Sequence, residues 1–247
     1  MHVSVRPFWC PKAGHSKEEY EDALSHRREA NLRSEALHFA IADGATESSF
    51  SDVWAQLLVK SSRRAPLNRN NVQKRIEQLG KRWEQRTAKP LPWYAERKRQ
   101  QGSFAAFLGL SLEEKGTWSA FAVGDSCLFQ VRNDSLMTCF PIERSDQFSS
   151  HQLLISSIYW KNEKIWERLS DFETIGSWQP GDVFFMMTDA LAQWFLSRCE
   201  EGETPWKGNL FTYGDLPLFA TDIDSMRASG EIRNDDVTLL IITIHRP

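Results

Sequence analysis

The chain has 247 residues, of which 41% are hydrophobic and 26% charged, with a net charge of −3 at pH 7. These values are ordinary for a folded globular protein and exclude a disordered or fibrous chain. A chain of this length buries about 70–75% of its unfolded surface, so its core needs no disulfide bonds.

The cysteines and the N-terminus indicate a reducing compartment. The four cysteines form no CxxC motif, which favours buried free thiols. The N-terminal residues lack the apolar stretch of about 7–15 residues that a signal peptide needs. No apolar run approaches the roughly 20 residues of a membrane span. We therefore expect a cytoplasmic protein that binds no membrane.

The first pronounced elements along the chain lie between residues 36 and 62. Residues 36–42 (ALHFAIA) have the apolar character of a buried strand, and a turn (DGATES) follows them. Residues 49–62 then show helical spacing, and Thr46 or Ser48 is placed to cap this helix.

Residues 60–101 form a basic block with 13 Lys and Arg against 3 Asp and Glu. Val72, Ile76, Leu79 and Trp83 recur at helical spacing, which predicts an amphipathic helix that ends before Pro90. A second, shorter helix is predicted from residue 92 to residue 101. Two interpretations of the block stay open: a solvated helix face, or a surface that attracts an anionic partner.

Four strands are predicted in mid-chain, at residues 103–112, 117–123, 126–132 and 135–142, and together they suggest an antiparallel meander. Asn133 and Asp134 form the predicted turn of its last hairpin.

The last third of the chain begins with a segment that lacks a clear pattern. Residues 143–171 hold Trp160 and Trp166 among charges, and we expect a flap there. A strand at 183–188, a helix at 190–199 and the strongest strand of the chain at 237–245 follow. The economical interpretation is one α+β domain over residues 1–247.

Several aspartates stand where predicted strands begin or end. Asp43, Asp125 and Asp189 each follow an apolar run, and Asp235 and Asp236 directly precede one. If these carboxylates converge, their repulsion raises each other's pKa, and a hard divalent cation removes that penalty. The six histidines form no HxH or HxxxH pair, so we expect no histidine-based metal site.

The order of these motifs resembles that of the metal-dependent serine/threonine protein phosphatases, the protein phosphatase 2C-like family, in its bacterial single-domain type. Each motif alone is weakly specific, but six occur in the family's order across nearly the whole chain. They are EYEDA (19–23), FAIADGATES (39–48), GSFAAFLGL (102–110), WSAFAVGDSCLFQVR (118–132), PGDVFFMMTDALAQWFL (180–196) and NDDVTLLIITI (234–244).

The resemblance implies a four-layer α-β-β-α sandwich, in which two antiparallel sheets are flanked by helices. It implies that Asp43 bridges two Mn²⁺ or Mg²⁺ ions, one of which also binds the carbonyl of Gly44. Asp189 and Asp235 hold the other ion. The implied reaction is hydrolysis of phosphoserine or phosphothreonine in a phosphorylated protein substrate, by a water that the two-metal centre activates.

Further roles follow from the same resemblance. Glu21 and Asp22 match the acidic pair that orients metal-bound water. Asp146 matches an aspartate linked to a third, weaker metal, whereas Asp125 is expected to be structural. Lys17 stands where the family has its phosphate-binding arginine; lysine attracts phosphate as a point charge, without a bidentate fork.

Departures from the family pattern leave a second function open. Lys17 replaces an arginine, and Ala45 and Ala190 stand where glycines are usual, so a non-catalytic pseudophosphatase that acts as a regulatory or binding module is the alternative. Nucleic-acid binding through the basic block is disfavoured, because the tryptophans more plausibly fill the core. We expect a monomer whose partner is a phosphoprotein and not a nucleic acid.

Overall fold

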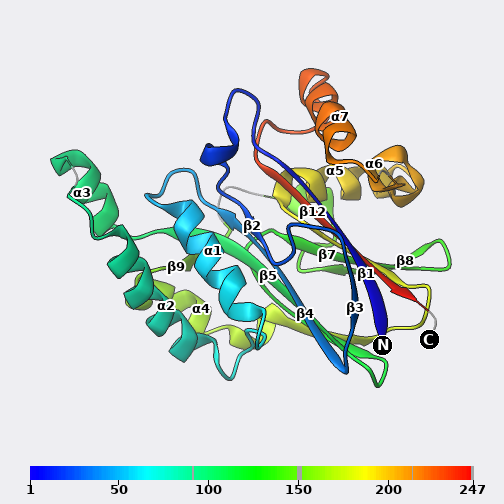
Figure 1. The fold of residues 1–247 in the computed structure, drawn as a ribbon, viewed down its shortest axis with the longest axis horizontal. Coiled ribbons are helices and arrows are strands. Elements are labelled where there is room, and N and C mark those ends of the chain that lie inside the picture. Colours follow the sequence, from blue (N-terminus) through cyan, green and yellow to red (C-terminus); the bar gives the residue numbers. More distant parts are fainter. Residues whose placement is uncertain (91, 149–151, 213, 246–247) are drawn as a thin grey trace.

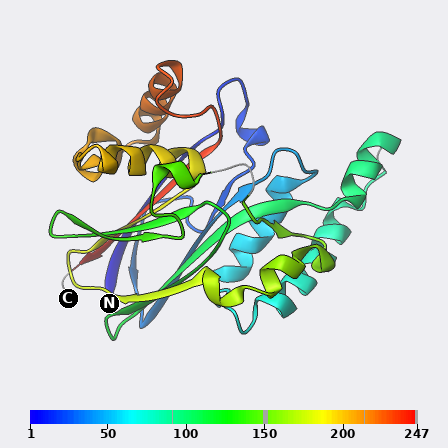
Figure 2. The same ribbon diagram turned by 180° about the vertical axis from the view of Figure 1, so that it is seen from behind.

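Two antiparallel six-stranded sheets pack face to face in this computed structural model, and helices cover both outer faces (Figure 1). The structure describes residues 1–90, 92–148, 152–212 and 214–245. Seen from behind, the same two sheets separate one group of helices from the other (Figure 2). The predicted four-layer α-β-β-α sandwich is thereby confirmed.

The first sheet is built around the C-terminal strand. Its order is β3-β1-β12-β11-β7-β8, so the two ends of the chain pair at its centre. The strands are β1 (His2–Cys10), β3 (Ala30–Arg33), β7 (Cys127–Arg132), β8 (Ser135–Phe140), β11 (Val183–Met187) and β12 (Val237–His245).

The second sheet has the order β10-β6-β5-β4-β2, with β9 pairing with β5 beyond the end of β6. Its strands are β2 (Ala23–Leu24), β4 (Ala36–Gly44), β5 (Phe104–Glu113), β6 (Thr117–Val123), β9 (Ile155–Ser156) and β10 (Glu173–Ser177).

Two groups of helices enclose the sheets. Helices α1 (Ser51–Ser62), α2 (Val72–Thr87) and α4 (Glu163–Trp166) cover the second sheet, and α3 (Trp93–Gln100) extends beyond them (Figure 1). Helices α5 (Asp189–Glu200), α6 (Asn209–Thr212) and α7 (Leu216–Ala228) cover the first sheet. Short 3₁₀ turns lie between them: η1 (Lys17–Glu19), η2 (Ser145–Gln147), η3 (Tyr159–Asn162), η4 (Leu169–Phe172) and η5 (Pro205–Lys207).

Three apolar clusters hold the layers together. The central cluster lies between the sheets, where Ile41 of β4, Leu108 of β5 and Ile242 of β12 are buried. An outer cluster packs Trp54 of α1 and Ile76 of α2 on the second sheet. The other outer cluster packs helices α5 to α7 on the first sheet. Alternate residues of each inner strand therefore serve two different cores, which explains why their sequences are apolar on both faces.

Two sequence predictions about local structure were wrong. The four mid-chain strands do not form one meander, because β5–β6 lies in the second sheet and β7–β8 in the first. Neither Thr46 nor Ser48 caps α1, whose N-cap is Phe50 in the left-handed region with φ of 58°. The Asn133–Asp134 turn is confirmed: both residues have positive φ, as a tight hairpin turn requires.

The segment 143–171 is well packed in its C-terminal part. Asn162 is fully buried and its side chain bonds the backbone of Ser156, which belongs to β9. Ile165 of α4 packs in the outer cluster under α2. Residues 149–151, including His151, lie outside the described residues, and the flap stays a prediction.

Within the described residues, no helix is both long and apolar enough to cross a membrane.

Candidate metal centre

Three aspartates that are far apart in the chain meet at one end of the sandwich. One carboxylate oxygen from each of Asp43, Asp125 and Asp189 lies within 4.8 Å of the other two. Asp43 is at the end of β4, Asp125 in the connection from β6 to β7, and Asp189 at the start of α5. The convergence that the strand-end positions suggested is confirmed for these three residues.

The backbone beside Asp43 is so tightly packed that only glycine fits. A Cβ atom on Gly44 would come within 2.7 Å of the carbonyl oxygen of Glu21 and 2.9 Å of the Cβ of Ser51. The β4 end is thereby clamped between the segment before β2 and the first turn of α1. This close packing fixes the position from which Asp43 points into the site.

Gly124 fixes the position of Asp125 in a similar way. Its φ is +102°, which non-glycine residues rarely adopt, and a Cβ atom there would lie 2.5 Å from the Cβ of Ala106. The chain leaves β6 through this glycine and crosses to the other sheet. Asp125 therefore lies between the two sheets, where β4 and α5 also end or begin.

Asp189 is the first residue of α5, directly after β11 and Thr188. Its carboxylate accepts the N–H of Ala190 at 2.5 Å and the guanidinium of Arg233 at 2.6 Å. Ala190 is buried in the helix and is not among the residues with positive φ, so the alanine that replaces a glycine here causes no backbone strain.

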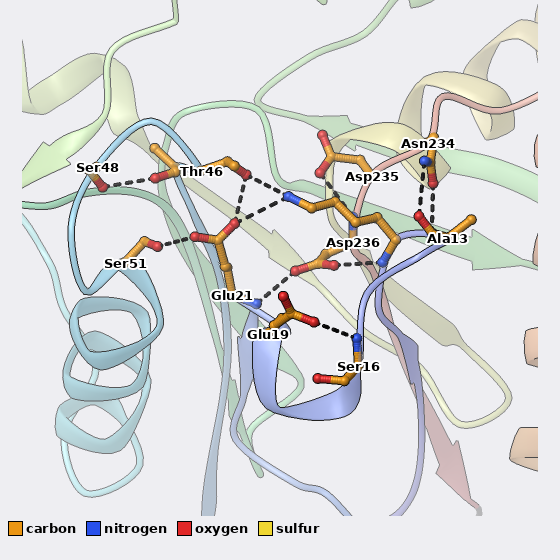
Figure 3. A network of polar contacts seen from close by, with 12 residues as sticks. Ala13, Ser16, Glu19, Glu21, Thr46, Ser48, Ser51, Asn234, Asp235 and Asp236 are labelled. Atoms are coloured by element: carbon orange, nitrogen blue, oxygen red, sulfur yellow. Dashed lines mark hydrogen bonds and ion pairs between the residues drawn. The ribbon is translucent and has the colours of Figure 1, made fainter.

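Asp235 and Asp236, which directly precede β12, have different surroundings. Asp235 is half-buried and close enough to raise the pKa of Asp43, Asp125 and Asp189, although it is not within the group of three. Asp236 is buried and accepts the backbone N–H of Lys12 at 2.8 Å and that of Glu21 at 2.7 Å (Figure 3). Asp236 thus fastens the N-terminal segment to the site.

Glu21 and Asp22 are both in the site but face different surroundings. Glu21 accepts hydrogen bonds from the hydroxyls of Ser51 and Thr46, the latter at 2.7 Å (Figure 3). Asp22 is only 1% exposed; its Oδ2 accepts the hydroxyl of Thr238 at 2.6 Å. Its Oδ1 is buried and has no hydrogen-bond partner among the described residues.

The electrostatics of these carboxyl groups are unfavourable without a cation. Burial, followed by repulsion from Asp22 and the other aspartates, raises the pKa of Asp43 well above its ordinary value. Burial also raises the pKa of Asp125, to about 7, with repulsion from Asp189 as the next cause. Burial and repulsion from Asp236 do the same for Asp22.

These observations fit a site for hard divalent cations. Its donors are carboxylate oxygens, which Mg²⁺ and Mn²⁺ prefer. An unpartnered buried oxygen on Asp22 and the mutual repulsion of at least three carboxylates both indicate that positive charge is missing.

Two cations of the protein itself already touch the site. Lys12 lies 3.4 Å from Glu21 Oε2 and 3.2 Å from the hydroxyl of Thr46. Arg233 pairs with Asp189 while its side chain stays 53% exposed. Lys17, the residue predicted to bind phosphate, is exposed in η1, and no hydrogen bond or ion pair joins it to another described residue.

Asp146 is not part of the acidic group of three. It is 61% exposed in η2 and pairs with Arg144, two residues before it. The assignment of Asp146 to a third metal stays a prediction that these surroundings do not support, whereas Asp125, expected to be structural, is the third member of the acidic group.

The cysteines take no part. All four are free, and burial raises the pKa of Cys10 and Cys199 to about 12 and of Cys139 to about 11. A thiol is a nucleophile only as thiolate, so these residues are unreactive near neutral pH.

Solved phosphatase structures share this architecture. The Mycobacterium tuberculosis serine/threonine phosphatase PstP/Ppp is 12% identical and matches with a TM-score of 0.61 over 100% of both chains. The PstP catalytic domain in complex with two manganese ions is 13% identical, with a TM-score of 0.55 over 99% of this chain and 100% of that one. RsbX in complex with magnesium is 16% identical, with a TM-score of 0.53 over 98% and 96%.

At these identities the likeness defines the class of fold: the α-β-β-α sandwich of metal-dependent phosphatases. The family model of protein phosphatase 2C matches residues 12–213, and the chain belongs to this family. The match includes Asp43, Asp125 and Asp189 and ends before Asp235. A comparison with curated protein sequences gave no match.

Proposed function

We propose that this protein hydrolyses phosphoserine and phosphothreonine in protein substrates, with Mn²⁺ or Mg²⁺ held by the acidic site. The observation that carries the proposal is the convergence of Asp43, Asp125 and Asp189 in a chain of the protein phosphatase 2C family. The manganese and magnesium in the related structures of PstP and RsbX support the choice of metal.

The residues that would hold the ions are Asp43, Asp125, Asp189 and Asp235, with the carbonyl of Gly44 beside them. Two hard cations supply a water of lowered pKa and neutralise the phosphate oxygens. This chemistry needs no nucleophilic side chain from the protein, in agreement with the unreactive cysteines.

The remaining residues of the site position a water or bind the phosphate group. Asp22, with its free Oδ1, is placed to accept a hydrogen bond from a water at the centre. Thr238 holds Asp22 in turn, and the hydroxyl of Tyr20 contacts Thr238 behind it. Because this chain of contacts is buried, it orients the carboxylate rigidly.

Arg233 and Lys12 are the best-placed residues for binding phosphate. A guanidinium forms two parallel hydrogen bonds with phosphate oxygens, and the exposed half of Arg233 faces solvent beside Asp189. Lys12 lies beside Glu21, and its ammonium group adds a single positive charge to the site. Together they compensate for the arginine that the sequence lacks at position 17.

The experiment compares the purified protein with two aspartate variants on a phosphothreonine peptide, with Mn²⁺ or Mg²⁺. Asp189→Asn removes a charge from the acidic group and is expected to lower kcat by about a hundredfold or more. Asp146→Asn makes the same chemical change at an exposed carboxylate and should leave kcat unchanged. Calorimetric titration with Mn²⁺ measures binding for each variant independently of activity.

The results separate the two functions. If the protein binds Mn²⁺ but hydrolyses no phosphopeptide or small aryl phosphate, the catalytic proposal is wrong. If it neither binds Mn²⁺ nor shows activity, it is a binding module that has kept the fold. Equal activity of Asp189→Asn and the unmodified protein would show that the acidic group is not the active site.

A further inference from the structure

A concentration of positive charge lines a groove between α1 and α2. The groove has a volume of about 660 Å³, and Leu57 of α1 and Leu79 of α2 lie at its base. We call this feature the basic groove. Six cationic side chains line it, and its lining contains no acidic residue: Lys60, Arg63, Arg64, Arg75, Arg82 and Arg86.

One of these cations holds the groove together. Arg75 donates to the carbonyl oxygens of Ala65 at 2.6 Å and Pro66 at 3.0 Å, and also to that of Ser61. It therefore joins the C-terminal end of α1 to α2 and gives the groove its shape. Because Arg75 donates to these three carbonyl groups, less of its positive charge is available to a ligand.

The other five cations are exposed and have no acidic partner. None of the ion pairs among the described residues includes Lys60, Arg63, Arg64, Arg82 or Arg86. Elsewhere on the same helix charge is balanced, because Lys81 pairs with Glu77 at 2.8 Å on the face turned away from the groove. On the groove side of helix α2, Arg82 and Arg86 therefore keep positive charge that no acidic side chain of the described residues neutralises.

The groove is directed toward the active site. The indole of Trp83 in α2 donates to the carbonyl of Phe50, which directly precedes α1, so the C-terminal part of α2 lies beside the start of α1 (Figure 1). Ser51, the next residue, bonds Glu21 in the site. Arg86 is one turn beyond Trp83, so the basic stripe leads toward that end of the molecule.

The distance suits an extended peptide. Lys60 is nine residues after Ser51 in α1, which corresponds to about 14 Å along a helix. An extended chain covers this distance in roughly four to five residues, at about 3.3 Å each. A substrate with its phosphorylated residue at the acidic site could therefore place a neighbouring segment in the basic groove.

We propose that the basic groove docks an acidic segment of the protein substrate, about four to eight residues from the phosphorylated serine or threonine. The occupant is a polypeptide rich in Asp and Glu, because five unpaired cations in a concave surface complement negative charge. No aromatic side chain lines the groove, which disfavours single-stranded nucleic acid, since such binding relies on base stacking. The identity of the occupant as substrate rests on the proposed function; the site itself does not.

The binding test uses the full chain and a fluorescent Glu-rich peptide without phosphate, measured by anisotropy. The double variant R82E/R86E reverses two charges in the groove and should weaken binding roughly tenfold or more. The matched control K74E/K81E makes the same change on the same helix outside the groove and should weaken it much less. Binding by the unmodified protein should decrease as salt increases.

The kinetic test uses the Mn²⁺-loaded enzyme with two phosphothreonine peptides, one flanked by glutamates and one neutral, and with p-nitrophenyl phosphate. R82E/R86E should raise KM for the acidic peptide roughly tenfold, with little change for the other two substrates.

Three results would overturn the proposal. The first is that R82E/R86E and K74E/K81E weaken binding of the acidic peptide equally. The second is that the unmodified protein does not bind the acidic peptide. The third is that it binds a single-stranded RNA more tightly than the acidic peptide and that R82E/R86E abolishes this RNA binding. If the protein has no phosphatase activity on any substrate, the proposed function fails, and the anisotropy measurement alone decides the groove.

Discussion

In the proposed mechanism, Arg233 is the residue at which metal binding and phosphate binding would compete. It pairs with Asp189 at 2.6 Å. Burial alone would lower the pKa of Arg233, but the negative charge of Asp189, Asp235 and Asp125 outweighs burial and raises that pKa. A bound divalent cation would weaken this pairing, since like charges then face each other across Asp189. The freed guanidinium would be available to an incoming phosphate.

The two roles of Arg233 predict opposite effects of Arg233→Ala. Removing the cation should tighten Mn²⁺ binding, measured by calorimetry, because Asp189 loses its internal partner. The same change should lower kcat/KM for a phosphopeptide about 10–100-fold, the value of a charge-assisted hydrogen bond. Lys17→Ala is the comparison: a larger loss there than for Arg233→Ala would assign phosphate binding to Lys17.

The acidic residues of the site could be predicted from the sequence because each follows or precedes a strong strand. Asp43, Asp125 and Asp189 lie at rigid element ends, so local pattern and family resemblance located them. Arg233 and Lys12 could not be found in this way, since their contacts are made by irregular segments and depend on tertiary folding. The contact of Thr238 with Asp22 could not be predicted for another reason. Thr238 lies inside β12, and its sequence position is that of an ordinary strand residue.

At the scale of elements, the turn before β11 depends on a buried ion pair. Arg132 of β7 donates to both carboxylate oxygens of Asp182, at 2.8 and 2.7 Å, and Gln130 adds a bond at 2.8 Å. Burial alone would raise the pKa of Asp182, but the hydrogen bonds from Arg132, the Gln179 N–H and Gln130 outweigh it and lower that pKa. The pair thus joins β7, β11 and the end of β10.

We expect Asp182→Asn to reduce the free energy of unfolding at pH 7 by about 2–3 kcal/mol, because Arg132 loses a buried partner. A lowered folded-state pKa adds stability above the unfolded value near 4, which is lost as pH falls through the folded pKa. The difference between the two proteins should therefore shrink when urea unfolding is repeated below about pH 4. Asp171→Asn breaks an exposed pair with Arg168 and should change stability by under about 0.5 kcal/mol.

Most helices and strands could be predicted from the periodicity of the sequence, but strand β1 and the crossing between the two sheets could not. Strand β1 was not recognised, although Val3 and Val5 alternate in it, because Pro7 interrupts its pattern. Pro7 is tolerated because β3 pairs with β1 only as far as Val5, so β1 is an edge at the proline. The meander prediction failed because sequence spacing cannot tell whether a short turn continues one sheet or crosses to the next. Gly124, with its positive φ, lies at that crossing.

At the scale of the whole molecule, we expect the acidic site to couple the stability of the sandwich to metal and to pH. The site joins both sheets: Asp43 comes from one, Asp125 from the crossing between them, and Asp189 from the element after β11. Repulsion among these groups therefore opposes the packing of the two sheets. A cation that binds only the folded protein removes this repulsion.

The pH dependence follows from the raised pKa values. A carboxyl group whose folded-state pKa is raised, as for Asp125 at about 7, contributes stability that is complete below the unfolded pKa. This contribution is lost as pH rises through the folded pKa. The metal-free protein should thus lose stability from about pH 4 to pH 7, the range in which the carboxylates become available to bind metal.

We therefore predict that Mn²⁺ stabilises the protein more at pH 8 than at pH 6. At a concentration 100 times Kd, Mn²⁺ adds about 2.7 kcal/mol, which raises Tm by roughly 5–10 °C for a chain of this size. Thermal melts with EDTA or Mn²⁺ at both pH values measure this. Asp43→Asn should reduce both the metal-induced rise and its pH dependence, whereas Asp146→Asn should change neither. A rise of equal size at both pH values would contradict the coupling, because protons and metal would then not compete for the same carboxylates.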